Sequence, residues 1–498
     1  MRVIIVGGVK TANPATQGGT VNTINPTTLQ IIGAVLFGLA VAHTFATRYF
    51  ERLAHTDRAH SGLWHLLGEV EAVFGFWALL LLGFMTFAWG WGGMTTYLDD
   101  QRFIEPMFVF VIMVIAASRP ITQFTGDLVH VSAKAMPLQR SLAMFFLSLS
   151  MVPMLGSIIT EPAAMTIAAL MLRDGVFAQN ISARIKYATI AVLFVNVSIG
   201  GALTNFAAPP VLMVAAKWEW SSAFMFATFG WKVALAVIIN AGLLTVLFHR
   251  ELKQAAATDS VVQRPARAPR VPLALVAINL VLLAGVVFAN HDPEVFMGLF
   301  LLFLGLAEAY KRHHDRLMIR EALMVAFFLA GLVVLGGKQQ WWLQELLEGM
   351  SGSTLFFGAT LLTAVTDNAA LTYLGSMVEG ISDEFKYALV AGALAGGGLT
   401  VIANAPNPAG YAILKDRFAD HSINLLGLFV AAVPPTLVAV LCLWGLNSVV
   451  YEMFSLAAWQ ERFAGVDRSF IFLLLLPFVV AAVGLWAARR ETAGGSQD

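Results

Sequence analysis

Long apolar runs without charge recur throughout this sequence and constrain its fold more than any other feature. Of its 498 residues, 58% are hydrophobic and only 12% are charged. A soluble protein of this size needs more polar surface, whereas such runs are long enough to cross a bilayer core of about 30 Å as helices. The short alternating segments of an outer-membrane barrel are absent. The sequence therefore predicts an all-α polytopic membrane protein.

The apolar runs predict roughly eleven crossings by the length rule. They fall near residues 29–47, 66–90, 103–118, 187–216, 222–248, 272–290, 294–310, 318–337, 387–414, 423–446 and 469–488. Two further runs, 141–172 and 353–378, do not fit this scheme.

The placement of Lys and Arg indicates on which side of the membrane these two runs enter and leave. The segment 249–270 is basic and contains two prolines, so we expect a flexible cytoplasmic linker. Basic connectors all fall inside, and acidic ones outside, only if 141–172 and 353–378 each enter and leave on the same side. The basic connectors are 48–58, 311–320 and 489–490, and the acidic ones are 99–100, 291–294, 345–348 and 383–384. The charge pattern thus predicts two re-entrant hairpins.

The run 141–172 contains a single charged residue, Glu161. As one continuous helix it would be about 48 Å long, too much for one upright span. Pro153, Gly156 and Pro162 lie near its middle, where a chain reversal is needed. Non-helical backbone at membrane depth is tolerated only inside protein or against a wet cavity. We therefore expect Glu161 at a buried hairpin tip.

Three sequence blocks occur twice, in the same order, which predicts an internal duplication. The pairs are TEPAAMT (160–166) with TDNAALT (366–372), IKYA (185–188) with FKYA (385–388), and GGALTNFAAPP (200–210) with GGGLTVIANAPNP (396–408). Each unit has a hairpin with an acidic tip, followed by a span interrupted by Gly, Asn and Pro. Because the hairpins enter from opposite sides, the repeats are inverted, which is typical of secondary transporters with a site near the midplane.

This organisation divides the chain into five parts. We expect an N-terminal tail with two spans (1–100), the first inverted repeat (101–249), the linker with two connecting spans (250–317), the second inverted repeat (318–446), and a last span with a tail (447–498).

These paired acidic hairpins and interrupted helices resemble the ion transporter superfamily, which includes arsenite-pump subunits, citrate and dicarboxylate carriers and sodium/proton antiporters. The sequence is most similar to the branch named the putative Na⁺/H⁺ antiporter family, over roughly residues 101–446. The resemblance implies a homodimer in which a transport domain moves against a scaffold as an elevator. It also implies a bacterial inner membrane, and the charge pattern places 249–270 and the C-terminus on its cytoplasmic side.

The hairpin tips depart from those of carboxylate-transporting relatives, which have Ser-Asn-Thr there. Thr160-Glu161-Pro162 and Thr366-Asp367-Asn368 take that place. The returning half-helix presents unpaired N–H groups that attract anions, and here Glu161 and Asp367 supply the anion themselves. A cavity with two fixed carboxylates should attract cations or protons and repel an anion.

The interrupted spans add side-chain oxygens that suit a hard cation such as Na⁺. The candidate cation- and proton-binding residues are Glu161, Asp367, Thr160, Thr366, Asn368, Thr204, Asn205, Thr400, Asn404 and Asn407, and the helix breaks are assigned to Pro162, Pro209, Pro210, Pro406 and Pro408. Two nearby carboxylates cannot both stay ionised cheaply, so a proton or a cation must neutralise one of them. The predicted function is Na⁺/H⁺ antiport, with an oxyanion or carboxylate carrier as the alternative.

Other charged residues receive different interpretations. Glu69 and Glu71 near the inner end of a span are read as interfacial or dimer-contacting, Lys232 as a counter-charge or a scaffold ion pair, and Asp127 as part of an amphipathic connector outside the site. The protease, hydrolase and Walker motifs are absent, so we expect neither an enzyme nor a resident cofactor or metal. Lys and Arg total 31, as do Asp and Glu, so the charge does not point to nucleic acid and we expect none as a partner.

Overall fold

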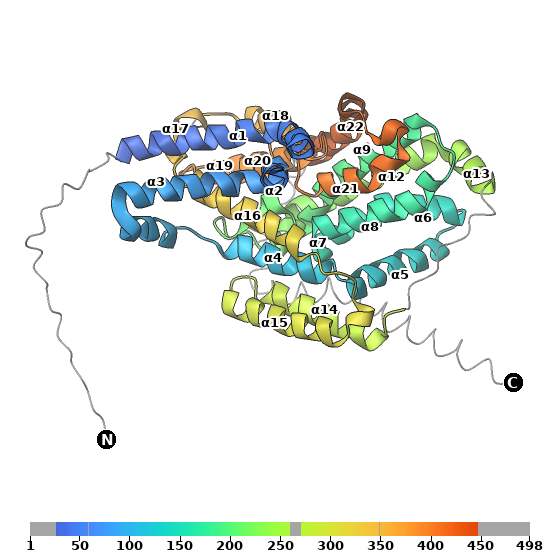
Figure 1. Cartoon of the computed structure of the whole chain (residues 1–498). Coiled ribbons are helices and arrows are strands. Elements are labelled where there is room, and N and C mark those ends of the chain that lie inside the picture. The colour runs from blue at the N-terminus through green and yellow to red at the C-terminus, as the bar shows by residue number, and fades with distance from the viewer. Residues whose placement is uncertain (1–25, 58, 259–269, 348, 447–498) are drawn as a thin grey trace, which may run out of the picture.

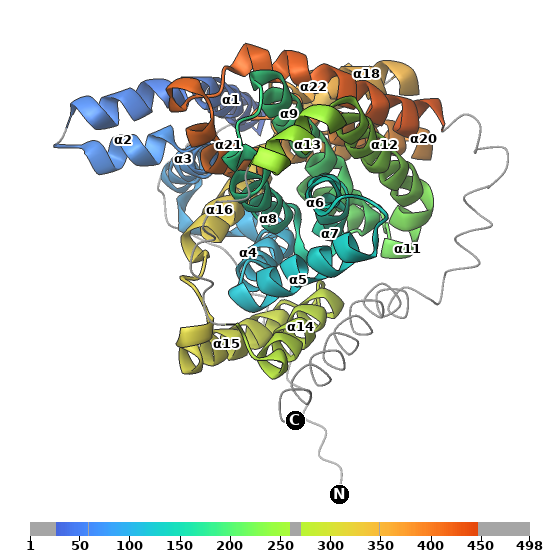
Figure 2. The ribbon, with the colours of Figure 1, turned by 90° about the vertical axis from the view of Figure 1, so that its right-hand side faces the viewer.

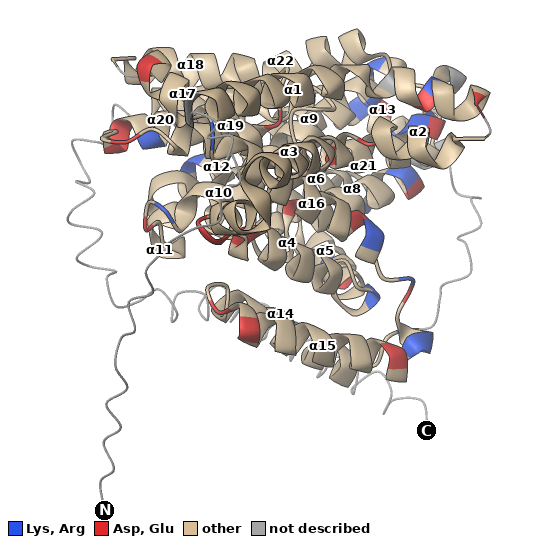
Figure 3. Cartoon of the chain, turned by 60° about the vertical axis from the view of Figure 1, so that its left-hand side comes forward, with Lys and Arg blue, Asp and Glu red and all other residues tan. Residues whose placement is uncertain are grey.

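The computed structural model describes residues 26–446 apart from 58, 259–269 and 348. Its regular elements in that part of the chain are all helical, and most of them run roughly parallel in one bundle (Figure 1). Charged residues gather mainly at the two opposite ends of this bundle, and the length between them is largely uncharged (Figure 3). The prediction of an all-α polytopic membrane protein is confirmed.

Six described helical stretches are long and apolar enough to cross a membrane. They contain α1 (Pro26–Thr56), α3 (Val70–Asp99), α9 (Ala183–Gly200), α12 (Trp231–Leu247), α16 (Ile319–Gly336) and α22 (Leu425–Val440). Two bent pairs of helices raise the number to eight if each pair is one span. In the first pair, α4 (Ile104–Ala116) and α5 (Arg119–Ala135) are bent by 64°. In the second, α6 (Arg140–Leu149) and α7 (Met151–Ile159) are bent by 42°.

Ten of the roughly eleven predicted crossings fall in the described residues, and fewer full spans are found there because some apolar runs are bent or broken and others form shorter helices. The run 103–118 yields only the 13 residues of α4 before the chain turns into α5. The runs 272–290 and 294–310 become α14 (Leu273–Phe288) and α15 (Pro293–Ala309), of 16 and 17 residues. The predicted span 469–488 lies outside the described residues.

The two unusual runs form helical hairpins. The first consists of α6, α7 and α8 (Glu161–Asp174), and the second of α18 (Gly352–Thr363) and α19 (Asn368–Ser376). The open end of the first packs beside α13 (His249–Thr258), and that of the second beside α17 (Gln340–Leu347). Figure 3 shows α13 and α17 at opposite ends of the bundle, so the hairpins enter it from opposite ends.

Each hairpin is followed by a helix that breaks at the predicted place. In the first unit α9 is followed by a short 3₁₀ turn, an irregular stretch and α10 (Pro209–Ala215), with prolines in the first turn of α10. In the second unit α20 (Asp383–Gly396) ends before α21 (Asn407–Leu414), which again has a proline in its first turn. Proline suits this position because the first N–H groups of a helix have no internal partner.

The two units interlock through these broken helices. Within each unit the first hairpin arm packs on the helix before the break, α7 on α9 and α18 on α20. The remaining halves exchange partners, because α8 packs against α21 and α10 against α19. Figure 2 shows α6, α7 and α8 near the middle of the molecule, with α14 and α15 along one edge.

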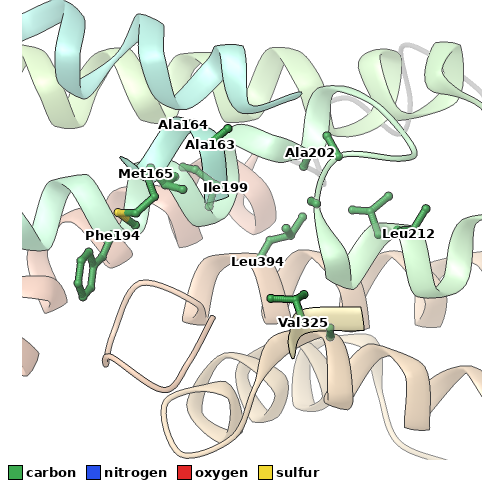
Figure 4. Packing of buried hydrophobic residues seen from close by; sticks show 14 of the residues in the cluster. Ala163, Ala164, Met165, Phe194, Ile199, Ala202, Leu212, Val325 and Leu394 are labelled. Carbon is green, nitrogen blue, oxygen red and sulfur yellow. The ribbon is translucent and has the colours of Figure 1, made fainter. Parts of the chain in front are cut away.

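Small side chains allow this close packing around the centre. Ala163 and Ala164 of α8 are buried beside larger apolar residues such as Phe194 and Ile199 of α9 (Figure 4). Leu394 of α20 lies in the same buried cluster, so the core is continuous across the two units. The remaining described helices are α2 (Ser61–Gly68) and α11 (Ser222–Met225), with a π-helical turn between α11 and α12.

A buried polar network fixes the first unit to its neighbours. Asn196 of α9 donates its Nδ2 protons to the carbonyl oxygens of Leu149 (2.7 Å) and Val237 (3.2 Å). Its Oδ1 accepts from Nδ2 of Asn240 at 2.9 Å, and Asn240 also donates to the Pro435 carbonyl at 3.2 Å. One asparagine pair thus joins α6, α9, α12 and α22.

We expect Asn196→Ala to lower the free energy of unfolding by about 1–3 kcal/mol, because the buried Leu149 and Val237 carbonyls lose a donor and Asn240 loses one of its two acceptors. The measurement is thermal unfolding of purified protein in detergent. Asn279→Ala is the matched control, since Asn279 is equally buried but donates only within its own helix, to Leu275. Equal losses in both variants would contradict the assigned role of the network.

Candidate functional site

Glu161 is the first residue of α8 and is completely buried, with an exposed fraction of 0%. Asn404 donates its Nδ2 proton to Glu161 Oε2 at 2.8 Å. Glu161 Oε1 has no hydrogen-bond partner in the described part of the chain, and no basic side chain there forms an ion pair with this carboxylate. A buried charge without a counter-charge is very costly. The side chain therefore requires a proton or a bound cation.

Asp367 has a different environment at the tip of the second hairpin. It caps α19, because its Oδ1 accepts from the backbone N–H groups of Ala369 (2.8 Å) and Ala370 (3.1 Å). It is half-buried and lines two cavities, an apolar one of about 220 Å³ that is also lined by residues of α1 and α3, and a smaller one of about 20 Å³ shared with Asn404. Glu161 is thus enclosed, whereas Asp367 faces open space.

The first tip is held by hydrogen bonds to the broken helix of its own unit. Ser157 of α7 donates its hydroxyl proton to the Gly200 carbonyl at 2.7 Å and accepts from the Leu203 N–H at 3.0 Å. Thr204 donates its hydroxyl proton to the Ser157 carbonyl at 2.7 Å. These bonds satisfy backbone groups that the helix break frees.

The second tip is held in the same way. The Asn368 N–H donates to the Ala403 carbonyl at 3.1 Å, and the Thr400 hydroxyl donates to the Ala364 carbonyl at 2.8 Å. Asn407 Nδ2 closes the break by donating to the carbonyls of Gly397 and Thr400, both at 2.8 Å.

Glycines at matched positions of the two units allow the tips to approach the breaks. A Cβ atom on Gly201 would lie 2.5 Å from Glu161 Oε1, and one on Gly397 would lie 2.8 Å from Asn368 Nδ2. Both distances are shorter than a carbon atom can make without displacing its neighbour. The tip side chain thus excludes a Cβ atom at Gly201, whereas at Gly397 the Ser198 hydroxyl of α9, which would lie closer still to the added atom, excludes it together with Asn368.

Several oxygens around the tips are buried and have no hydrogen-bond partner among the described residues. They are Glu161 Oε1, Thr160 Oγ1, Asn368 Oδ1, Asn404 Oδ1 and Asn407 Oδ1. The described residues contain no group of three or more His, Cys, Asp and Glu that could hold a metal ion. Amide, hydroxyl and carboxylate oxygens without nitrogen or sulfur ligands suit a hard cation.

The structure thus brings Glu161, Thr160, Asn368, Asn404 and Asn407 together, with Asp367 at the edge of this group. Thr160 has a φ of +73°, which turns the chain at the tip, and its hydroxyl makes no capping bond.

The other predicted residues are placed differently. The hydroxyls of Thr204 and Thr400 donate to backbone, and that of Thr366 donates to the Leu362 carbonyl within its own hairpin arm. Asn205 lies farther along the break, where it donates to the Trp220 carbonyl at 2.9 Å and accepts from Ser222 at 2.7 Å.

Sequence reasoning missed two residues beside the site. Ser157 holds the first tip. The sequence hinted at this role only in that Thr363, another hydroxyl residue, occupies the matching position of the second unit. Glu71 of α3 lines the small cavity with Asp367 and Asn404, although it was assigned to an interface. Lys232, interpreted from the sequence as a counter-charge or part of a scaffold ion pair, donates to the Tyr387 hydroxyl at 2.9 Å.

Comparison with known proteins identifies the family. Residues 28–446 match the family described as "Putative Na+/H+ antiporter". The chain belongs to this family. This member is an integral membrane protein and a transporter.

Among solved structures, the antiporter-family chain is similar to the YdaH transporter of Alcanivorax borkumensis, whose structure is described as revealing an unusual topology. The two share 16% sequence identity with a TM-score of 0.40, over 77% of this chain and 98% of that one. No curated protein matches the sequence.

We expect Gly201→Ala to impair cation-dependent transport strongly, because the added methyl group displaces the Glu161 carboxylate from its present position. Gly242→Ala is the control, since a Cβ atom there would meet nothing within 4 Å. Both variants are compared with wild type for ion flux in proteoliposomes and for thermal stability. A Gly201→Ala protein that transports at the wild-type rate would contradict the close approach of break and tip.

Proposed function

We propose that this protein exchanges Na⁺ for protons and that Glu161 is the residue at which the two ions compete. The observation that carries the proposal is the enclosed Glu161 carboxylate. Among the described residues its Oε1 has no hydrogen-bond partner, and neighbouring side chains offer further oxygens without partners. Either a proton or a cation can neutralise such a group, but both cannot occupy it together. Exclusive occupancy of one site by two ions is the simplest basis for antiport.

The arrangement of the two units supports alternating access. Hairpins that enter from opposite ends and meet broken helices near the middle are typical of inverted-repeat transporters, in which one body moves against another around the site. The interlocked units, α6–α10 and α18–α21, would form the moving body of an elevator. We further propose a homodimer in a bacterial inner membrane, with α13 and segment 249–270 on the cytoplasmic side.

The alternative, a carrier of oxyanions or carboxylates, is less well supported. An anion would seek the free N–H groups at the start of α8 or α19. At α19 the Asp367 carboxylate already accepts from the N–H groups of Ala369 and Ala370. A second anion placed there would be repelled by Asp367 and by Glu161 whenever they are ionised.

We expect Glu161→Gln to abolish Na⁺-dependent proton flux and Asp367→Asn to reduce it sharply. Glutamine can still accept the hydrogen bond from Asn404 Nδ2, so the fold is preserved. Its side chain does not ionise, however, and cannot exchange a proton for a cation. The measurement is dequenching of an enclosed pH dye in proteoliposomes after addition of Na⁺, with choline and citrate as comparison solutes.

Glu105→Gln is the control for both variants, because Glu105 lies at the start of α4 beside a separate small cavity. Wild-type rates in Glu161→Gln and Asp367→Asn, or proton movement driven by citrate and not by Na⁺, would refute the proposal.

A further inference from the structure

We propose that Glu71, Asp367 and Asn404 form a second, outer cation site that loads the inner site at Glu161 with a monovalent cation. This inference rests on the proposed function, but it concerns a residue outside the two duplicated units. The proposed outer site is the small cavity that α3 and α16 form against the second hairpin tip and the second helix break.

The cavity has the size of a single-ion site, and its mostly apolar lining includes three residues with polar side chains. Its volume of about 20 Å³ is enough for roughly one water molecule or an ion of similar size. Val70, Val325 and Phe328 provide apolar walls, whereas Glu71, Asp367 and Asn404 provide oxygens. Two carboxylates that face one small space with apolar walls favour a cation in it.

Among the described residues, Glu71 shares its one nearby cation, Arg320, with a second glutamate. Glu69, two residues earlier, forms an ion pair with Arg320 at the start of α16. Glu71 is half-buried and forms no ion pair within the described ranges. The Arg320 guanidinium is thus bonded to Glu69 and acts on Glu71 only from a distance, so the Glu71 carboxylate remains available to a mobile cation.

Asn404 connects this cavity to the inner site. It lines the cavity, is only 1% exposed, and has an Oδ1 atom without a hydrogen-bond partner among the described residues. Its Nδ2 donates to Glu161 Oε2 at 2.8 Å. A cation held between Glu71 and Asp367 is therefore separated from Glu161 by one amide group, and Asn404 Oδ1 is an intermediate ligand between the two sites.

The outer site is built from two bodies. Glu71 belongs to α3, whereas Asp367 and Asn404 belong to the second unit. If that unit moves against α3 and α16 during transport, the outer site is complete in the present arrangement and is divided when the unit moves away. An outer site of this kind loads the transporter from one side only.

We expect Glu71→Gln to raise the KM for Na⁺ by at least about fivefold, a usual size for coupling between two sites, while the maximal rate of exchange is retained. Glu71→Asp should recover part of the affinity because it restores the charge. Glu105→Gln, which alters a carboxylate beside another cavity, should leave KM unchanged. The readout is the Na⁺ dependence of proton flux in proteoliposomes.

An unchanged KM in Glu71→Gln, or a lower maximal rate without a change in KM, would overturn the outer site while leaving Na⁺/H⁺ exchange intact. Absence of Na⁺-dependent proton flux in the wild type would instead refute the proposed function.

A second measurement does not depend on the folding of Glu71→Gln. In a Cys442→Ala background, which removes the single native cysteine, Val70→Cys places a thiol on the cavity wall. Reaction of this thiol with a small methanethiosulfonate reagent should be slower in NaCl than in choline chloride. Equal labelling rates in the two salts would also overturn the outer site.

Discussion

The hydrogen bond from Asn404 to Glu161 is the interaction on which the rest of the site depends. It joins the tip of the first hairpin to the break in the second broken helix, and it is made by a fully buried carboxylate. A carboxylate in this environment is tolerated only if its charge is balanced or removed. The bond also orients the Asn404 amide so that its oxygen remains available to an ion.

The interlocking of the two units explains why this bond can form. Each hairpin tip is tied to the break of its own unit, by Ser157 in the first and by Asn368 in the second. The exchanged packing of α8 on α21 and of α10 on α19 then brings the two tips and the two breaks to one place. Backbone groups freed at membrane depth, which are costly to leave unsatisfied, are bonded by side chains of the breaks. Side-chain oxygens of the tips and breaks are the ones that stay without partners among the described residues.

The sequence predicted the parts of the site that local chemistry determines. Prolines and glycines marked both breaks, and the lone Glu161 in a long apolar run marked a tip. The matched glycines, Gly201 and Gly397, both lie where a Cβ atom has no room, against Glu161 in the first unit and against Ser198 and Asn368 in the second.

Properties that depend on long-range packing could not be read from the sequence. Asn205 and Asn404 carry the same amide near the two breaks. Within the described part of the chain Asn404 bonds Glu161, whereas Asn205 bonds Trp220 and Ser222 instead. Glu71 lies outside the repeats, so no internal comparison could indicate it. The apolar run at α4 is also cut short, because the chain bends by 64° into α5. Pro120 in the first turn of α5 was a local signal that the preceding helix ends there.

The most direct test of the central claim is an experimental structure determined by electron cryomicroscopy in NaCl and again in choline chloride. The account predicts density for one ion in contact with Glu161 Oε1 and Asn404 Oδ1 in NaCl, and its loss in choline chloride. A structure with Glu161 facing lipid or paired with a basic side chain, or with the ion bound away from both residues, would contradict it.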